Sequence, residues 1–119
     1  MTSPDQSVLD LEGAARRLAL PPEVLAGILS DFRQKYANVV ADISGRVEAG
    51  DMDEAGRLAH NLKGLAGTLG AVSLQTPAAR LEAAIDAGSE SGTETALREL
   101  GRHMTRALAE IDAWLEANT

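Results

Sequence analysis

The sequence predicts an all-α protein, an antiparallel up-down four-helix bundle with an additional short N-terminal helix. Its 119 residues are rich in alanine and leucine, which favour helices, and only 3% are the aromatic residues that favour sheets. The apolar residues recur at helical spacing, and the segments between them are short, so sequential helices should be antiparallel neighbours. We expect residues 1–6 to form a flexible tail and residues 7–119 to form a single domain.

Two helices are expected in the N-terminal part of the chain. The first lies within residues 8–20 and is ended by Pro21 and Pro22. Its apolar positions are Leu11, Ala14, Ala15 and Leu18. The second is predicted as one continuous helix that opens at Pro22 or Glu23 and ends near Gly50, because glycine readily takes the left-handed conformation. Its apolar stripe comprises Val24, Leu25, Ile28, Leu29, Phe32, Tyr36, Val39, Val40, Ile43 and Val47.

Capping residues mark the next two helices. Asp51 is expected to cap a helix over residues 52–69, and Glu54, three residues later, completes a pattern that resembles a capping box. Ser73 is expected to cap a fourth long segment over residues 74–87.

The last helix is predicted to begin at Thr93, after a loop over residues 88–92 that is rich in glycine and serine. Its apolar stripe comprises Leu97, Leu100, Met104, Leu108, Ile111 and Leu115.

Charge and composition exclude several classes of function. The formal net charge of −7 repels phosphate backbones and anionic lipids, so we expect no nucleic-acid partner and no membrane insertion. The absence of cysteine excludes disulfides, thiolate nucleophiles and cysteine-ligated metals. No signal peptide is visible, and no apolar run reaches the roughly 18 residues of a membrane span. We therefore expect a cytoplasmic monomer.

His60 occupies an unusual place on the helix expected over residues 52–69. At about 100° per residue, His60 lies about 200° from Leu62 and so points away from the leucine face of the helix. Its nearest neighbours around the helix are three glycines and two cations: Gly56, Gly64, Gly67, Arg57 and Lys63.

Three glycines are costly on a face that only needs to be solvated, because each loses about 0.8–1 kcal/mol relative to alanine in a helix. We interpret them as giving another protein close access to the imidazole, with Lys63 as a cation for an anion attached there. Accessible nitrogen, open space and a nearby cation suit reversible phosphorylation of His60. The alternatives are an exposed histidine without function and glycines that allow close helix packing.

The run AHNLKGLAGTLGA, residues 59–71, resembles the signature of histidine-containing phosphotransfer (HPt) domains. The resemblance covers about residues 8–88 and weakens in the last helix. The N-terminal part of the chain is most similar to the C-terminal module of hybrid sensor histidine kinases. Further matches are residues 49–51 and 57–59, and Leu74, Ala78, Leu81 and Glu82.

The resemblance implies a phosphocarrier in a two-component multistep phosphorelay. His60 would accept a phosphoryl group from a receiver-domain aspartyl phosphate and pass it to another receiver aspartate. Lys63 would balance the phosphoryl charge, and Glu82 would orient the histidine by holding one ring N–H, although an ordinary surface carboxylate is the alternative for Glu82. The residues implied in receiver access and docking are Gly56, Arg57, Gly64 and Gly67.

The partners implied are response-regulator receiver domains and an upstream hybrid histidine kinase. The chain has no P-loop and no dense carboxylate cluster, so we expect no ATP binding, no kinase activity, no cofactor and no metal site of its own. The Mg²⁺ should belong to the receiver. One alternative is a helical docking module that binds a receiver or a partner helix without phosphorylation. A metal-assisted hydrolase is disfavoured because His103, a boundary residue of the last helix, is the only other histidine.

Overall fold

The computed structural model describes residues 11–69 and 71–118, and this part of the chain is α-helical without strands. The predicted all-α class is therefore confirmed. The predicted tail over residues 1–6 lies outside the described residues. The helices are α1 (Leu11–Leu18), α2 (Pro22–Tyr36), α3 (Val39–Glu48), α4 (Met52–Thr68), α5 (Val72–Asp86) and α6 (Glu90–Ala117).

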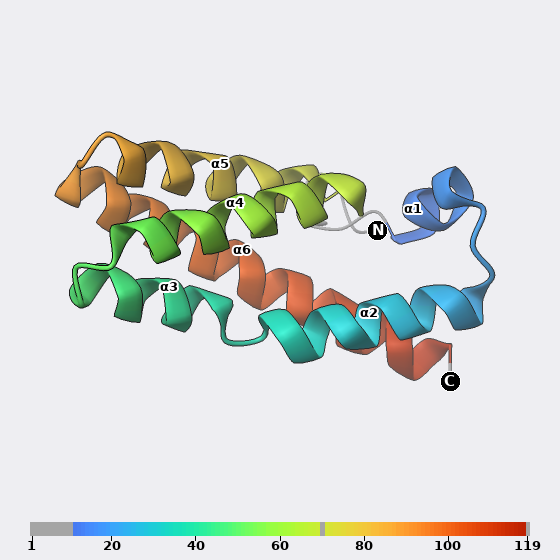
Figure 1. The fold of residues 1–119 in the computed structure, drawn as a ribbon. Helices are drawn as coiled ribbons and strands as arrows, with labels where there is room; N and C mark the ends of the chain where they lie inside the picture. The colour runs from blue at the N-terminus through green and yellow to red at the C-terminus, as the bar shows by residue number, and fades with distance from the viewer. Residues whose placement is uncertain (1–10, 70, 119) are drawn as a thin grey trace.

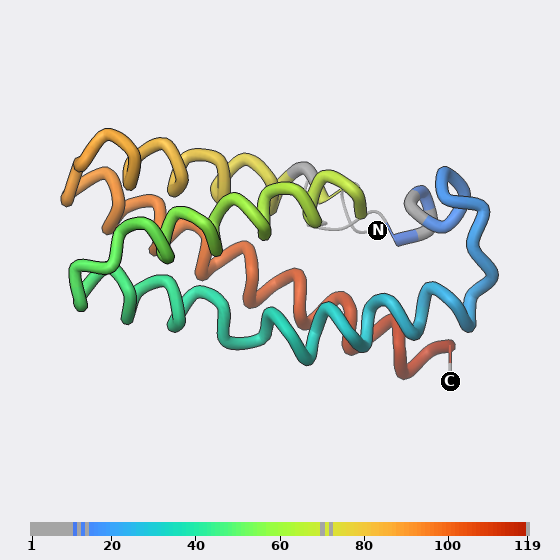
Figure 2. Tube along the Cα trace, viewed as in Figure 1, coloured from blue at the N-terminus to red at the C-terminus, as the bar shows by residue number. Residues whose placement is uncertain are grey.

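Helix α6 is the longest helix described, with 28 residues, and it runs along the full length of the bundle (Figure 1). Helices α4 and α5 form an antiparallel pair on one side of α6, and α2 and α3 lie end to end along the other side (Figures 1 and 2). The predicted up-down bundle is thus formed by α4, α5, α6 and the consecutive pair α2 and α3. Helix α1 lies at one end of the bundle, close to the start of α2 (Figure 1).

The second helix was predicted to be continuous, and this prediction is wrong. The helix breaks at Ala37 and Asn38, where Asn38 has φ −111° and ψ 12° and is not helical. Asparagine favours such a break because its side chain competes for backbone hydrogen bonds. The stripe of apolar residues hides the break, because Phe32 on α2 and Val39 on α3 are both buried on the same side.

Two predicted helix ends are confirmed. Gly50 has φ +78°, the left-handed conformation that ends α3 and turns the chain into α4. Asp51 caps α4, because its Oδ1 accepts a hydrogen bond from the backbone N–H of Glu54 at 3.4 Å.

Two predicted helix starts are wrong. Ser73 lies inside α5, whose N-cap is Ala71, with no side-chain capping bond. Helix α6 starts at Glu90 and not at Thr93, because the Ser89 hydroxyl caps it by accepting from the backbone N–H of Gly92 at 3.0 Å. A Cβ at Gly92 would lie 2.7 Å from the Ser89 Oγ, so the absent side chain makes room for this cap.

The core is a continuous cluster of leucine, isoleucine and alanine side chains, and each large one that is fully buried contributes about 1.5–3 kcal/mol. Leu18 and Val24 were predicted to belong to the apolar stripes, but they are 40% and 44% exposed near the α1–α2 turn. The large, fully buried side chains are Leu25, Leu29, Ile43, Leu62, Leu69, Leu74, Leu81, Leu100 and Ile111.

Across the described residues, no helix is long and apolar enough to span a membrane.

Ion pairs join α6 to α2 and to α5 in the part of the chain that the structure describes. Arg33 on α2 binds Asp112 through two nitrogens, with Nη2 3.0 Å from Oδ2, and this pairing lowers the pKa of the Asp112 carboxyl. Arg80 on α5 lies 3.3 Å from Glu99. Both pairs are partly exposed, so each adds little to stability compared with the core.

Candidate functional site

His60 projects from the middle of α4 on the side away from the core. The core side of this helix is made mostly of small residues, Ala55, Ala59 and Ala66, together with Leu62, all fully buried. The His60 side chain is 64% exposed, so the predicted outward orientation is confirmed. The small alanines allow α4 to pack closely on its neighbours while the imidazole remains at the surface.

Glu82 on α5 binds both of the chemically important side chains of α4. Its Oε2 lies 2.7 Å from His60 Nδ1, and its Oε1 lies 2.7 Å from Lys63 Nζ. An ionised carboxylate only accepts hydrogen bonds, so Nδ1 carries the hydrogen in this contact. The hydrogen bond from Lys63 is the main reason that the pKa of Glu82 lies below its usual range, with a smaller contribution from His60.

The Lys63 side chain is 32% exposed and is held against Glu82. The Glu82 side chain is itself 22% exposed. The alternative that Glu82 is an ordinary surface carboxylate therefore does not describe its surroundings: it is half-buried between a cation and an imidazole. The His60 Nε2 atom has no hydrogen-bond partner among the residues the structure describes.

The three glycines on the His60 side of α4 differ in how much space surrounds them. A Cβ at Gly64 would meet nothing within 4 Å, so this position opens onto space beside His60. A Cβ at Gly67 would lie 2.7 Å from Nε2 of Gln75, and one at Gly56 would lie 3.7 Å from Ile85. Gly64 and Gly67 are both exposed, and Gly67 meets the end of the Gln75 side chain from α5. Gly56 is half-buried against Ile85, so Gly64 is the most open of the three.

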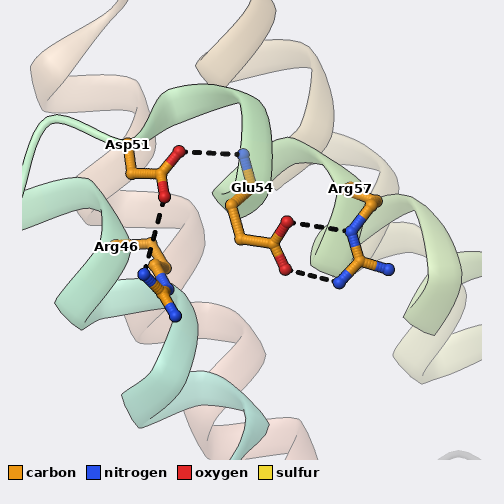
Figure 3. Close-up of polar contacts among 4 residues, drawn as sticks. All are labelled: Arg46, Asp51, Glu54 and Arg57. Atoms are coloured by element: carbon orange, nitrogen blue, oxygen red, sulfur yellow. Dashed lines mark hydrogen bonds and ion pairs between the residues drawn. The ribbon is translucent and has the colours of Figure 1, made fainter.

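Arg57 was predicted as a docking cation beside His60, and the structure gives it an acidic partner. Its guanidinium binds both carboxylate oxygens of Glu54, with Nε 2.9 Å from Oε2 (Figure 3). The pair lowers the pKa of Glu54 and raises that of Arg57. Because the Glu54 carboxylate binds Arg57, it does not return to Asp51, and only half of the predicted capping box forms.

Arg46 at the end of α3 completes the charged groups around the start of α4. Its Nη1 lies 3.5 Å from Oδ2 of Asp51, the residue that caps α4 (Figure 3). This contact joins the two helices across the Gly50 turn. Both side chains are about half exposed, so the contact adds little to the Asp51 cap and the Gly50 turn that set the start of α4.

Glu54 is the member of this site that was not predicted to act there. The signal was present in the sequence, since Glu54 and Arg57 are three residues apart and such pairs meet on a helix surface. Gln75, whose side chain reaches Gly67, carried no comparable signal because this contact depends on how α5 packs against α4.

The remaining predicted features lie elsewhere. His103 is half-buried on α6, as expected of a boundary residue, and its Nδ1 has no hydrogen-bond partner within the described part of the chain. A groove of about 970 Å³ lies between α3 and the first turns of α6, and His60 does not line it. No group of three or more potential metal ligands is found among residues 11–69 and 71–118.

A match to a protein-family model identifies the family of this chain. The family model described as the Hpt domain matches residues 27–114. The chain belongs to the Hpt domain family. The match begins inside α2 and extends almost to the end of α6, so it includes the last helix, where the resemblance was weaker, and leaves out α1. Searches among curated proteins and among solved structures found no match.

Hpt domains carry out histidine phosphotransfer in phosphorelays of two-component signalling, and they act as phosphocarriers and not as kinases. Their partners in these relays are receiver domains and kinases.

Proposed function

We propose that His60 is the phosphoacceptor of this Hpt domain and that the protein carries a phosphoryl group between receiver-domain aspartates. The observation that supports this most directly is the His60 imidazole itself. It is 64% exposed, and its Nδ1 is held 2.7 Å from the Glu82 carboxylate. The contact fixes one ring nitrogen as the hydrogen donor and leaves the lone pair on Nε2, the nitrogen directed away from Glu82.

The transfer then requires no proton to leave the histidine. The Nε2 lone pair attacks the phosphorus of the receiver's aspartyl phosphate, and a P–N bond forms as the P–O bond to aspartate breaks. The electron pair of that bond remains on the aspartate, which leaves as a carboxylate. The phosphorylated ring keeps its Nδ1 hydrogen and becomes cationic, so the negative charge of Glu82 stabilises it. Attack by the aspartate of a second receiver reverses these steps.

Lys63 and Gly64 have separate roles in this proposal. The Lys63 ammonium sits one turn after His60 on a flexible stem, from which it can reach phosphoryl oxygens while remaining close to Glu82. Gly64 leaves open space next to the imidazole, which lets the loops around the receiver's aspartate approach. The receiver supplies the Mg²⁺ and its acidic ligands, and this domain supplies the ring, the cation and the surface.

Transfer of label from a phosphorylated receiver domain tests the assignment. Wild-type protein should remove label from the receiver and gain phosphate that is labile in acid and stable in base. His60→Gln should not, whereas His103→Gln, the matched control at the other histidine, should behave as wild type. Equal loss of label with wild type and His60→Gln would reject His60 as the acceptor. Binding of the receiver without any transfer would favour the docking module.

A further inference from the structure

Four side chains on α4 form a row with His60 between two cations. Glu54, Arg57, His60 and Lys63 are spaced by three residues, so each lies next to the following one on the helix surface. Arg57 therefore lies one turn before His60, and Lys63 lies one turn after it. A group attached to His60 is thus flanked by a cation on either side.

Each of these cations is already paired with a carboxylate in the structure. Lys63 is bound to Glu82, which also holds His60. Arg57 is bound through two nitrogens to Glu54 (Figure 3). A phosphoryl group brings about −1.5 to −2 units of charge. Lys63 can reach the phosphoryl oxygens but also neutralises Glu82, so a second cation is needed to balance the remaining charge.

The Arg57–Glu54 pair is the better suited to exchange. The Arg57 side chain is 59% exposed and lies on the same helix as its partner, and ion pairs of this kind are weak. In the described part of the structure, the Glu54 carboxylate has no hydrogen bond other than those from Arg57. The charge of Arg46 also acts on it, so Glu54 keeps a nearby cation when Arg57 leaves. Glu82, in contrast, is half-buried and also holds the histidine ring, so separating it from Lys63 disturbs the reacting group.

We propose that Glu54 restrains Arg57 in the resting protein and that Arg57 leaves Glu54 to bind the phosphoryl oxygens once His60 is phosphorylated. This inference rests on the proposed function, because it needs phosphate on His60. Arg57 is then a second phosphoryl-binding cation, and Glu54 is a restraining residue that acts only through Arg57. The exchange breaks and forms ion pairs without any covalent step.

The test uses phosphoramidate as the phosphoryl donor, so that no receiver is required. Formation of phosphohistidine is followed by ³¹P NMR in the wild type, in Glu54→Gln, in Arg57→Gln and in the double variant. Asp53→Asn is the matched control, because Asp53 is an exposed acid in the same first turn of α4 that the structure does not pair with Arg57. The Nε–H signal of Arg57 reports where the guanidinium is bound, and circular dichroism confirms that each variant is folded.

We expect Glu54→Gln to accelerate phosphorylation about twofold and Arg57→Gln to slow it about threefold, magnitudes typical of exposed ion pairs. Asp53→Asn should stay near the wild-type rate. In the Arg57→Gln background, Glu54→Gln should have no further effect, since the restrained group is absent. The Arg57 Nε–H signal should move on phosphorylation of the wild type.

Three results would overturn the inference while leaving the proposed function intact. These are equal acceleration by Glu54→Gln and Asp53→Asn, an effect of Glu54→Gln that persists without Arg57, and an Arg57 signal that does not move when His60 is phosphorylated. If the wild type gains no more phosphate than His60→Gln, the proposed function fails, and this inference fails with it.

Discussion

At the scale of single residues, the Glu82 carboxylate connects the chemistry of the site to pH. Its pKa is held below the usual range, first by the hydrogen bond from Lys63 and then by that from His60, although partial burial opposes both. A carboxyl whose pKa is lower in the folded than in the unfolded chain stabilises the fold above its ordinary pKa of about 4.3. That stabilisation is lost as the pH falls through the lowered folded value.

Replacing Lys63 with methionine removes the main cause of this shift. We predict that the titration midpoint of Glu82, measured by ¹³C NMR of its carboxyl carbon, moves upward in Lys63→Met toward the ordinary value. Lys35→Met, which changes the net charge equally, should leave the midpoint in place. A midpoint that does not move in Lys63→Met would mean that Lys63 does not hold Glu82 in solution.

Gly64 and Gly67 provide a matched pair of substitutions on the same face of α4. Gly64→Ala should raise the free energy of unfolding by about 0.5–1 kcal/mol, because the new methyl meets nothing within 4 Å and alanine favours the helix. Gly67→Ala should give a smaller gain, because Gln75 must move. Thermal unfolding measures both.

The same pair tests access to His60. Gly64→Ala should slow transfer from a receiver in spite of its greater stability. Transfer by Gly64→Ala at the wild-type rate would show that the open space beside His60 is not used by the receiver.

The sequence was sufficient to place His60, because its orientation depends only on helix phase. The pairing of Lys63 with Glu82 could not be predicted in the same way, since these residues lie on different helices and meet only when α4 packs on α5. The environments of Gly56 and Gly67 depend on that packing too. Glu54 and Arg57 meet within one helix, so their pairing was accessible from spacing alone.

At the scale of helices, apolar periodicity predicts that a helix exists but does not locate its ends. The stripe through Phe32 and Val39 continues across the break at Asn38, because both helices bury the same side. The start of α6 is set by one hydroxyl, that of Ser89, although Ser91 and Gly92, which follow it, are typical of a loop. Local hydrogen bonds decide these boundaries, and a pattern of apolar residues does not contain them.

Ser89→Ala tests the cap that begins α6. Loss of this N-cap should lower the free energy of unfolding by about 1 kcal/mol, which corresponds to a decrease in Tm of roughly 4 °C for a domain of this size. Ser91→Ala is the control, because Ser91 is exposed in the same turn and does not cap the helix. Equal changes in Tm for the two variants would contradict the assignment of Ser89 as the cap.

At the scale of the whole molecule, the long helix that supports the bundle is not one of the helices that carry the candidate site. Helix α6 spans the length of the molecule and packs against α2, α3 and α5, whereas the candidate site lies on α4 and α5 (Figure 1). The family match from residue 27 to residue 114 covers both parts and omits α1 at the end of the bundle. A rigid support of this kind keeps the α4 and α5 side chains in register, which a transfer between two proteins requires.

In the proposed mechanism, phosphate is carried on Nε2 of His60, the ring nitrogen that Glu82 does not hold. NMR correlation between ³¹P and ¹⁵N in the phosphorylated protein identifies the nitrogen directly. We predict one phosphohistidine signal, on Nε2 of His60. Phosphate on Nδ1 of His60, on His103 or on no histidine would contradict the account.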